Sequence, residues 1–465
     1  MTSGADATGA RHLSLWWDQV ASQAPDELLE RPPLDGDTTA DVVVVGAGLT
    51  GLWTAYYLHE ADPSLDVLVV EQEVAGFGAS GRNGGWCSAR LPQSPEALAR
   101  RHGRDAALAL RAAMRDTVVE VGGVARAEGI ECGFAYGGTV TLARNVAQLE
   151  RVRAEAAGAG QWGDEEHPLD AEGVAAHVRA SGVLGGSWTP DCARVQPVAL
   201  TRGLARVVEG RGVRIAERTR VLRLSPRAVV TDRGTARSRW IVRATEAWTA
   251  QLPGSRREIA PVYSLMIATE PLPAEVWAQV GLERAETFTD GRHLTIYGAR
   301  TPDDRLVLGG RGARYHAGSS ISPSFDRATR GHERLRRTLV ELFPAVAGAA
   351  ITHRWGGALG VPRDWHASVG LDAATGIGWA GGYVGDGVAA ANLAGRTLAD
   401  LVTGADTPLA RLPWVGHRSP HWEPEPVRWA EIAATARATA LADREERRTG
   451  RSSRVAALVA PLLGR

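Results

Sequence analysis

The sequence contains no lysine, so all 53 of its basic residues are arginine. Codon bias in a GC-rich gene explains this composition, but the absence still has a chemical consequence. Without lysine, the chain can form neither a Schiff base with pyridoxal phosphate nor the lysine contact of a phosphate-binding P-loop. The 53 acidic residues bring the formal net charge to zero, which gives no electrostatic reason to expect a nucleic-acid partner.

Cysteine is scarce as well, which argues against a disulfide framework or a zinc site. Cys87, Cys132 and Cys192 are scattered along the chain, and the 12 histidines show no metal-ligand spacing. The first residues lack the apolar core of a signal peptide. The apolar stretch 42–58 is interrupted by three glycines and two threonines, so it indicates a strand, a turn and a helix. We therefore expect a cytoplasmic protein with no membrane span and no metal site.

The length of 465 residues and a hydrophobic content of 44% favour two or three domains. Residues 41–45 and 67–70 are short runs of branched apolar residues on either side of a helical segment, as in a buried βαβ unit. Further helices are expected at 95–128, 144–180, 198–209, 328–343 and within 426–465, and a mostly antiparallel sheet at 261–315. The predicted fold class is α/β.

This pattern predicts a discontinuous Rossmann-like domain and a substrate domain built on a mostly antiparallel sheet. We expect the first domain at 38–95, 190–260 and 350–405, and the second at 96–189 and 261–349. Residues 1–37 would form an N-terminal extension. Residues 406–465 would form a C-terminal helical extension, packed back on the protein or, alternatively, serving a membrane surface or a partner.

A dinucleotide fingerprint follows the first strand. Gly46, Gly48 and Gly51 have the G-x-G-x-x-G spacing, and Glu71 ends the next strand. The glycines permit a tight turn, close approach of a pyrophosphate and close helix packing, while the carboxylate accepts hydrogen bonds from ribose hydroxyls. The candidate cofactor-binding residues of this unit are Gly46, Ala47, Gly48, Leu49, Thr50, Gly51, Glu71 and Gln72.

Two further glycine-rich segments suit the same ligand. The loop at 78–85 can wrap a flat ring and a pyrophosphate, with Arg82 neutralising phosphate charge. The turn at 381–388 leads into a helix whose N-terminus favours negative charge on a reduced flavin, and Asp386 suits a helix cap better than a catalytic role. The candidates here are Gly78, Ser80, Gly81, Arg82, Asn83, Gly84, Gly85, Gly382, Gly385, Asp386, Gly387 and Val388.

Together with the segment 244–248, these motifs resemble the D-amino-acid-oxidase-like flavoproteins, and within them the gamma-glutamylputrescine oxidases. The resemblance spans about residues 38–405 and departs from the usual pattern at Glu246, where glycine is common. It implies non-covalently bound FAD, and a small amine or amino acid whose C–N bond loses hydride to flavin N5. It also adds Val221, Ala244, Thr245 and Trp248 to the cofactor candidates.

The substrate side is predicted less sharply. Arg311, Arg363 and Tyr315 lie where the resemblance places the active site, and an arginine there would bind a substrate carboxylate. A structural ion pair is the alternative for each of these arginines. Electrons would pass to oxygen or to another acceptor, such as a quinone or a carrier protein. A non-catalytic FAD-binding redox sensor is a further alternative.

Overall fold

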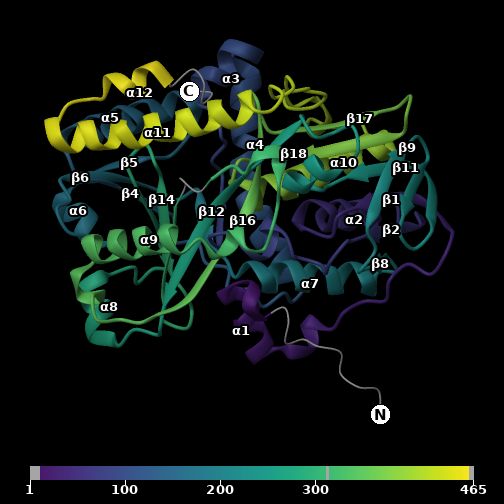
Figure 1. Cartoon of the computed structure of the whole chain (residues 1–465), viewed down its shortest axis with the longest axis horizontal. Coiled ribbons are helices and arrows are strands. Elements are labelled where there is room, and N and C mark those ends of the chain that lie inside the picture. The colour runs from purple at the N-terminus through teal and green to yellow at the C-terminus, as the bar shows by residue number, and fades with distance from the viewer. Residues whose placement is uncertain (1–10, 311–313, 460–465) are drawn as a thin grey trace.

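The computed structural model describes residues 11–310 and 314–459. Two eight-stranded sheets lie side by side, with the first sheet on the right of Figure 1 and the second on the left. A two-stranded sheet, β3 (Trp86–Ser88) with β7 (Cys192–Arg194), lies apart from both. The helices are α1 (Leu15–Gln23), α2 (Leu49–Ala61), α3 (Pro95–His102), α4 (Arg104–Ala127), α5 (Val146–Ala159), α6 (Ala171–Ala175), α7 (Pro197–Gly210), α8 (Ala274–Val280), α9 (Thr329–Leu342), α10 (Gly387–Thr403), α11 (Val427–Thr449) and α12 (Arg454–Val459).

The first sheet has a parallel centre in the order β18-β11-β1-β2-β8, with β17 antiparallel at the β18 edge. A β9–β10 hairpin extends from β11. Parallel neighbours need crossover connections, and α2 provides the one between β1 and β2, as the βαβ pattern predicts. The strands are β1 (Thr38–Val45), β2 (Val67–Val70), β8 (Arg214–Ala216), β9 (Val221–Ser225), β10 (Ala228–Thr231), β11 (Thr235–Arg243), β17 (Ser368–Asp372) and β18 (Ile377–Gly381).

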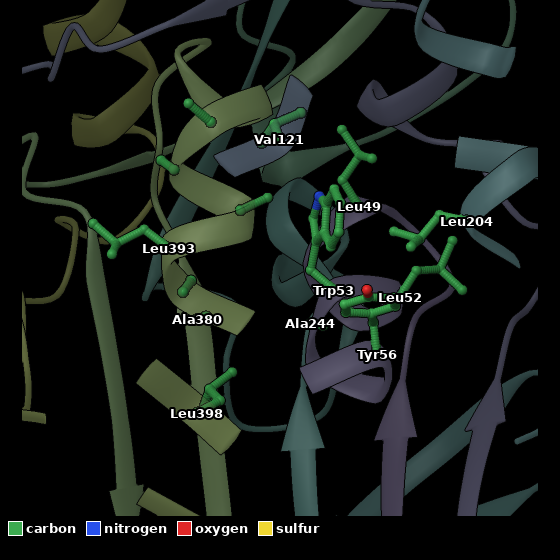
Figure 2. Packing of buried hydrophobic residues seen from close by; sticks show 14 of the residues in the cluster. Leu49, Leu52, Trp53, Tyr56, Val121, Leu204, Ala244, Ala380, Leu393 and Leu398 are labelled. Atoms are coloured by element: carbon green, nitrogen blue, oxygen red, sulfur yellow. The ribbon is translucent and has the colours of Figure 1, made fainter. Parts of the chain in front are cut away.

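The branched residues of β1 fill two layers, because successive side chains of a strand point to opposite faces. Val42 and Val44 join the core beneath α2 and α10, while Val43 and Val45 pack on the side of the β9–β10 hairpin. Figure 2 shows Leu52, Trp53 and Tyr56 of α2 in the same cluster as Leu393 and Leu398 of α10. The fingerprint helix is thus held firmly against its sheet.

The second sheet has the order β16-β12-β15-β14-β13-β4-β6-β5 and is antiparallel except between β13 and β4. Its strands are β4 (Thr139–Ala143), β5 (His167–Asp170), β6 (Gly185–Thr189), β12 (Ile259–Thr269), β13 (Thr287–Asp290), β14 (Ile296–Arg300), β15 (Leu306–Gly310) and β16 (Ile351–Pro362). Mixed sheets with a Rossmann-like half agree with the predicted α/β class.

Three details differ from the sequence expectations. The segment 144–180 is not one helical region, since β5 interrupts it and pairs with β6. β16 pairs with β12 along its length and so belongs to the second sheet, although we placed 350–405 in the cofactor domain. Three glycines obscure its strand pattern. The buried face of α4 joins the core of the first sheet, although we assigned 96–189 to the substrate domain.

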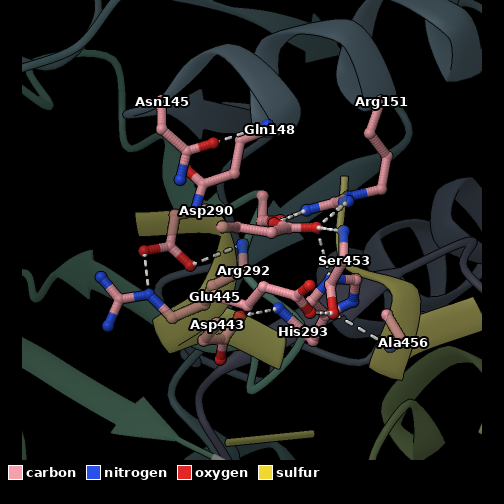
Figure 3. Close-up of polar contacts among 12 residues, drawn as sticks. Asn145, Gln148, Arg151, Asp290, Arg292, His293, Asp443, Glu445, Ser453 and Ala456 are labelled. Atoms are coloured by element: carbon pink, nitrogen blue, oxygen red, sulfur yellow. Dashed lines mark hydrogen bonds and ion pairs between the residues drawn. The ribbon is translucent and has the colours of Figure 1, made fainter. Parts of the chain in front are cut away.

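The C-terminal extension packs back on the second sheet and α5. Buried Glu446 of α11 accepts hydrogen bonds from Arg151 of α5 and contacts His293 in the β13–β14 loop at 2.8 Å. Asp443 accepts from the backbone N–H groups of His293 and Leu294. Figure 3 shows these polar contacts converging on the helix. The packed-back alternative for the extension is therefore the observed one.

Candidate functional site

The turn between β1 and α2 requires two of its glycines. Gly46 has φ +106°, and a Cβ there would lie 2.6 Å from the carbonyl oxygen of Ala244. A Cβ on Gly51 would lie 1.9 Å from the carbonyl oxygen of Gly46. These contacts leave room only for glycine and bring the turn close to β11. As a result, the N-terminus of α2 faces a cavity, where it favours a ligand phosphate.

Glu71 lies just past the end of β2, on the wall of the same cavity. Its Oε2 accepts a hydrogen bond from the backbone N–H of Ala47 at 2.8 Å, and its Oε1 accepts from Glu73 N–H at 2.9 Å. Burial raises the pKa of Glu71 to about 7, despite these two hydrogen bonds. The carboxylate keeps lone pairs that can accept hydrogen bonds from ligand hydroxyls.

The N-terminal extension anchors the glycine-rich loop from behind. The Ser14 hydroxyl donates to Gly81 O, and the Trp16 indole N–H donates to Asn83 O, both at 2.8 Å. Within the loop, Ser80 Oγ accepts from the N–H of Leu49 at the start of α2. The loop is thus fixed both to the N-terminal extension around α1 and to the start of α2.

Arg82, which we expected to neutralise phosphate charge, is held by protein groups. Its guanidinium pairs with Asp326 and donates to Phe77 O, because a buried cation needs a fixed partner. Asp386 stands at the N-cap position of α10, but its side chain makes no capping hydrogen bond. Both residues face a second cavity beside the first.

The first cavity runs from Glu71 to the start of α10, and most of the predicted cofactor residues line it. These are Gly46, Gly48, Leu49, Thr50, Glu71, Gln72, Gly78, Ser80, Asn83, Val221, Ala244, Thr245, Trp248, Gly385, Gly387 and Val388. Arg82, Gly84 and Asp386 line only the second cavity, and Ala47, Gly51, Gly81, Gly85 and Gly382 line neither. A tight glycine turn, two helix N-termini and a buried carboxylate fit a dinucleotide such as FAD.

The second cavity adjoins the first and shares part of its wall. Both are lined by Ala79, Asn83, Leu359, Gly385 and Val388. Its remaining walls come from the glycine-rich loop, the segment 86–92 and strands of the second sheet. On those strands Ser264 and Tyr297 share a hydrogen bond of 2.8 Å between their hydroxyl oxygens. This places polar side chains of the second sheet opposite one end of the first cavity.

Arg90 is the arginine of this second cavity that the sequence reasoning missed. It donates to Thr141 Oγ1 at 3.4 Å, and no carboxylate of the described residues pairs with it. Its position directly after the glycine-rich loop and β3 was the available signal. The abundance of arginine in this chain hid that signal.

Two of the three predicted catalytic residues, Arg363 and Tyr315, contact the C-terminal extension. Arg363 pairs with Glu423 and Glu431 of the C-terminal extension, which is the structural alternative for it. Tyr315 donates to Glu425 and lies against the same extension. Neither is among the described residues that line the two cavities. Arg311 lies outside the described residues.

Comparison with known proteins identifies the family. The model of the FAD dependent oxidoreductase (DAO) family matches residues 41–401. The chain belongs to this family. It is 29% identical over 379 residues to gamma-glutamylputrescine oxidoreductase of Escherichia coli, covering 80% of this chain and 85% of that protein. It is also 29% identical to a probable oxidoreductase, OrdL, of Rhizobium meliloti, covering 85% of this chain and 89% of that protein.

Solved structures show the same fold for this FAD-dependent oxidoreductase. Glycine oxidase of Geobacillus kaustophilus superposes with a TM-score of 0.66 at 21% identity, over 82% of this chain and 99% of that one. L-proline dehydrogenase of P. horikoshii also gives 0.66, at 20% identity, over 82% and 96% of the two chains. The family match makes the chain an FAD-dependent oxidoreductase, and the solved structures show that it has the fold of amino-acid-oxidising relatives.

Two features are absent from the described residues. No helix there is both long and apolar enough to cross a membrane. Within 11–310 and 314–459, histidine, cysteine, aspartate and glutamate side chains form no group suited to a metal ion.

Proposed function

We propose that this enzyme oxidises the C–N bond of a small amine or amino acid that carries a carboxylate. FAD would lie non-covalently along the first cavity, with its isoalloxazine ring at the junction, and the substrate would occupy the second cavity. The observation that supports this most is the shared wall of the two cavities, in which Leu359, Gly385 and Val388 border both spaces. A molecule in the second cavity would meet the reactive end of a cofactor in the first.

When bound, FAD supplies an acceptor for the hydride that leaves the carbon next to the substrate nitrogen, and water hydrolyses the resulting imine. The protein's part is to position the substrate and exclude bulk water. The Ser264–Tyr297 hydrogen bond fixes the Tyr297 ring in the second cavity, beside the glycine-rich loop. The N-terminus of α10, at Gly387 and Val388, stabilises negative charge at the junction.

Arg90 would bind the carboxylate of the substrate. Among the described residues no carboxylate pairs with the Arg90 guanidinium, so it can take an incoming carboxylate in a bidentate geometry, which also orients the substrate. Arg363 cannot do this while Glu423 and Glu431 hold its guanidinium.

Anaerobic mixing with paired ligands tests the proposal. A panel of amino acids is tested, and each amino acid is compared with the amine that lacks its carboxylate. Bleaching of the flavin absorbance reports reduction of the flavin. We expect Arg90→Gln to weaken apparent affinity for the carboxylated partner about 10- to 100-fold and to leave the plain amine unchanged. Arg100→Gln, an exposed change on α3, is the matched control. Equal losses for both partners would contradict the role of Arg90, and a panel that bleaches nothing would contradict the function.

A further inference from the structure

Glu246 has an unusual backbone for its residue type. It begins the short 3-10 helix η5 (Glu246–Gln251), three residues after the last residue of β11, and has φ +43°. Glycine adopts this conformation freely, whereas a residue with a Cβ pays a steric cost. The contacts of the glutamate side chain therefore have to offset this cost.

Its carboxylate joins two segments that are more than a hundred residues away in sequence. Oε2 accepts from the N–H of Gly360 in β16 at 2.6 Å, and Oε1 accepts from the N–H groups of Gly382 and Tyr383 at 3.1 Å each. A Cβ on Gly360 would lie 2.0 Å from Oε2, so this contact requires glycine at position 360. Glu246 therefore ties the second sheet to the turn that starts α10.

Glu246 also lines the first cavity, and its hydrogen bonds tie it to the turn that starts α10, whereas Glu71 lies just past the end of β2. Its partner Gly360 follows Leu359, which borders both cavities. A carboxylate has about four lone-pair positions, and three backbone N–H groups donate hydrogen bonds to it here, while the N–H of Ala247 is close enough to lower its pKa. Oε2 accepts only one of these three bonds, so it can also accept from a hydrogen-bond donor in the cavity. The side chain of Tyr383, whose backbone N–H contacts Glu246, forms a hydrogen bond with the Thr50 hydroxyl. Burial raises the pKa of the Tyr383 phenol, so this group stays neutral.

We propose that Glu246 is a cofactor-binding residue whose carboxylate accepts a hydrogen bond from a hydroxyl of the sugar-alcohol chain in the flavin half of FAD. Two half-buried carboxylates then serve one cofactor, Glu71 at the adenosine half and Glu246 at the flavin half. A negative charge beside the flavin half opposes the negative charge of the reduced cofactor. Glu246 therefore lowers the reduction potential of the bound flavin. The inference depends on FAD, which the family shares, and not on the substrate proposed above.

Two measurements on the purified holoenzyme test the inference. FAD release after dilution is followed by the rise in flavin fluorescence, and the reduction potential is measured anaerobically at about pH 8.5. Burial raises the pKa of Glu246 to about 7, so the carboxylate is ionised at that pH and protonated near pH 5.5. We expect Glu246→Gln to speed FAD release about tenfold, because one charge-assisted hydrogen bond to the cofactor is lost. We also expect it to raise the reduction potential at pH 8.5. The difference in potential from wild type should shrink near pH 5.5.

Three variants separate contact from folding. Glu246→Gly relieves the strained φ and should fold normally while releasing FAD faster and raising the potential. Glu71→Gln should speed release without moving the potential, because its charge lies at the far half. Glu258→Gln, which removes the carboxylate that pairs with Arg243 outside both cavities, should change neither readout. A Glu246→Gln enzyme with wild-type release, or with faster release but an unchanged potential at pH 8.5, would overturn the proposal.

Discussion

Glu71→Gln should weaken FAD binding strongly and leave the chemistry almost intact. The carboxylate accepts one backbone N–H on each oxygen, from Ala47 and from Glu73. Glutamine has a single acceptor oxygen, so its amide nitrogen must face one of these N–H groups, donor against donor. The variant also loses the charge that strengthens a hydrogen bond to a ribose hydroxyl.

The expected size follows from these contacts. Losing a hydrogen bond to a charged group costs about 1.5–3 kcal/mol, which corresponds to a factor of about 10 to 150 in affinity. The rate of flavin reduction by a saturating substrate should change less than about twofold, because Glu71 does not line the second cavity.

The assay follows FAD fluorescence after dilution of the holoenzyme, then flavin bleaching in a stopped-flow instrument. Glu60→Gln is the matched control, since Glu60 lies near the end of α2, away from both cavities, and pairs with Arg211. Wild-type FAD release in Glu71→Gln would refute the assignment of Glu71 to the adenosine half. A large loss in the reduction rate at full FAD occupancy would refute its distance from the reacting atoms.

Three further predictions concern the extension and the electron acceptor. Arg363→Ala should lower the free energy of unfolding by about 1–2 kcal/mol and expose α11 to limited proteolysis, with flavin reduction unchanged; a specific loss of reduction would restore Arg363 to the active site. Burial alone would raise the pKa of Glu446, but His293 and Arg151 lower it from 4.5 to about 2. Its ionised form therefore stabilises the fold above pH 4.5, and this stabilisation is lost as the pH falls towards 2, so thermal unfolding of wild type and Glu446→Gln should converge over that range. A constant difference between the two would contradict this assignment. Because the chain has no lysine to stabilise forming superoxide, the reduced enzyme should react with oxygen no faster than free reduced flavin, and much faster reoxidation in stopped-flow mixing would show that lysine is dispensable here.

The cofactor-binding part of the fold could be predicted from local sequence patterns. The fingerprint at 46–51 and the strand before Glu71 have short-range causes, namely a tight turn, a helix N-terminus and a buried strand, and these can be recognised from spacing. The antiparallel character of 261–315 was visible for the same reason. β16 was missed because its pairing with β12 is long-range and its glycines weaken the strand pattern.

The substrate half depends on contacts between distant segments, which spacing does not encode. Arg363 and Arg90 look alike in sequence, but only Arg363 meets two carboxylates, and these come from the C-terminal extension. The partner of Arg82, Asp326, lies more than two hundred residues away. The role of Glu246 was likewise hidden, because its three N–H donors come from two segments beyond residue 350.

The most direct test of the account is anaerobic reduction of the bound flavin by an amino acid that bleaches the flavin absorbance. The rate is compared with that of the same compound deuterated at the carbon next to nitrogen. If the enzyme removes hydride from that carbon, the flavin should bleach several-fold more slowly with the deuterated compound, and an imine-derived carbonyl product should form in equal amount. Bleaching at the same rate with both compounds, at full saturation and with chemistry rate-limiting, would contradict C–N oxidation by hydride transfer at the junction of the two cavities.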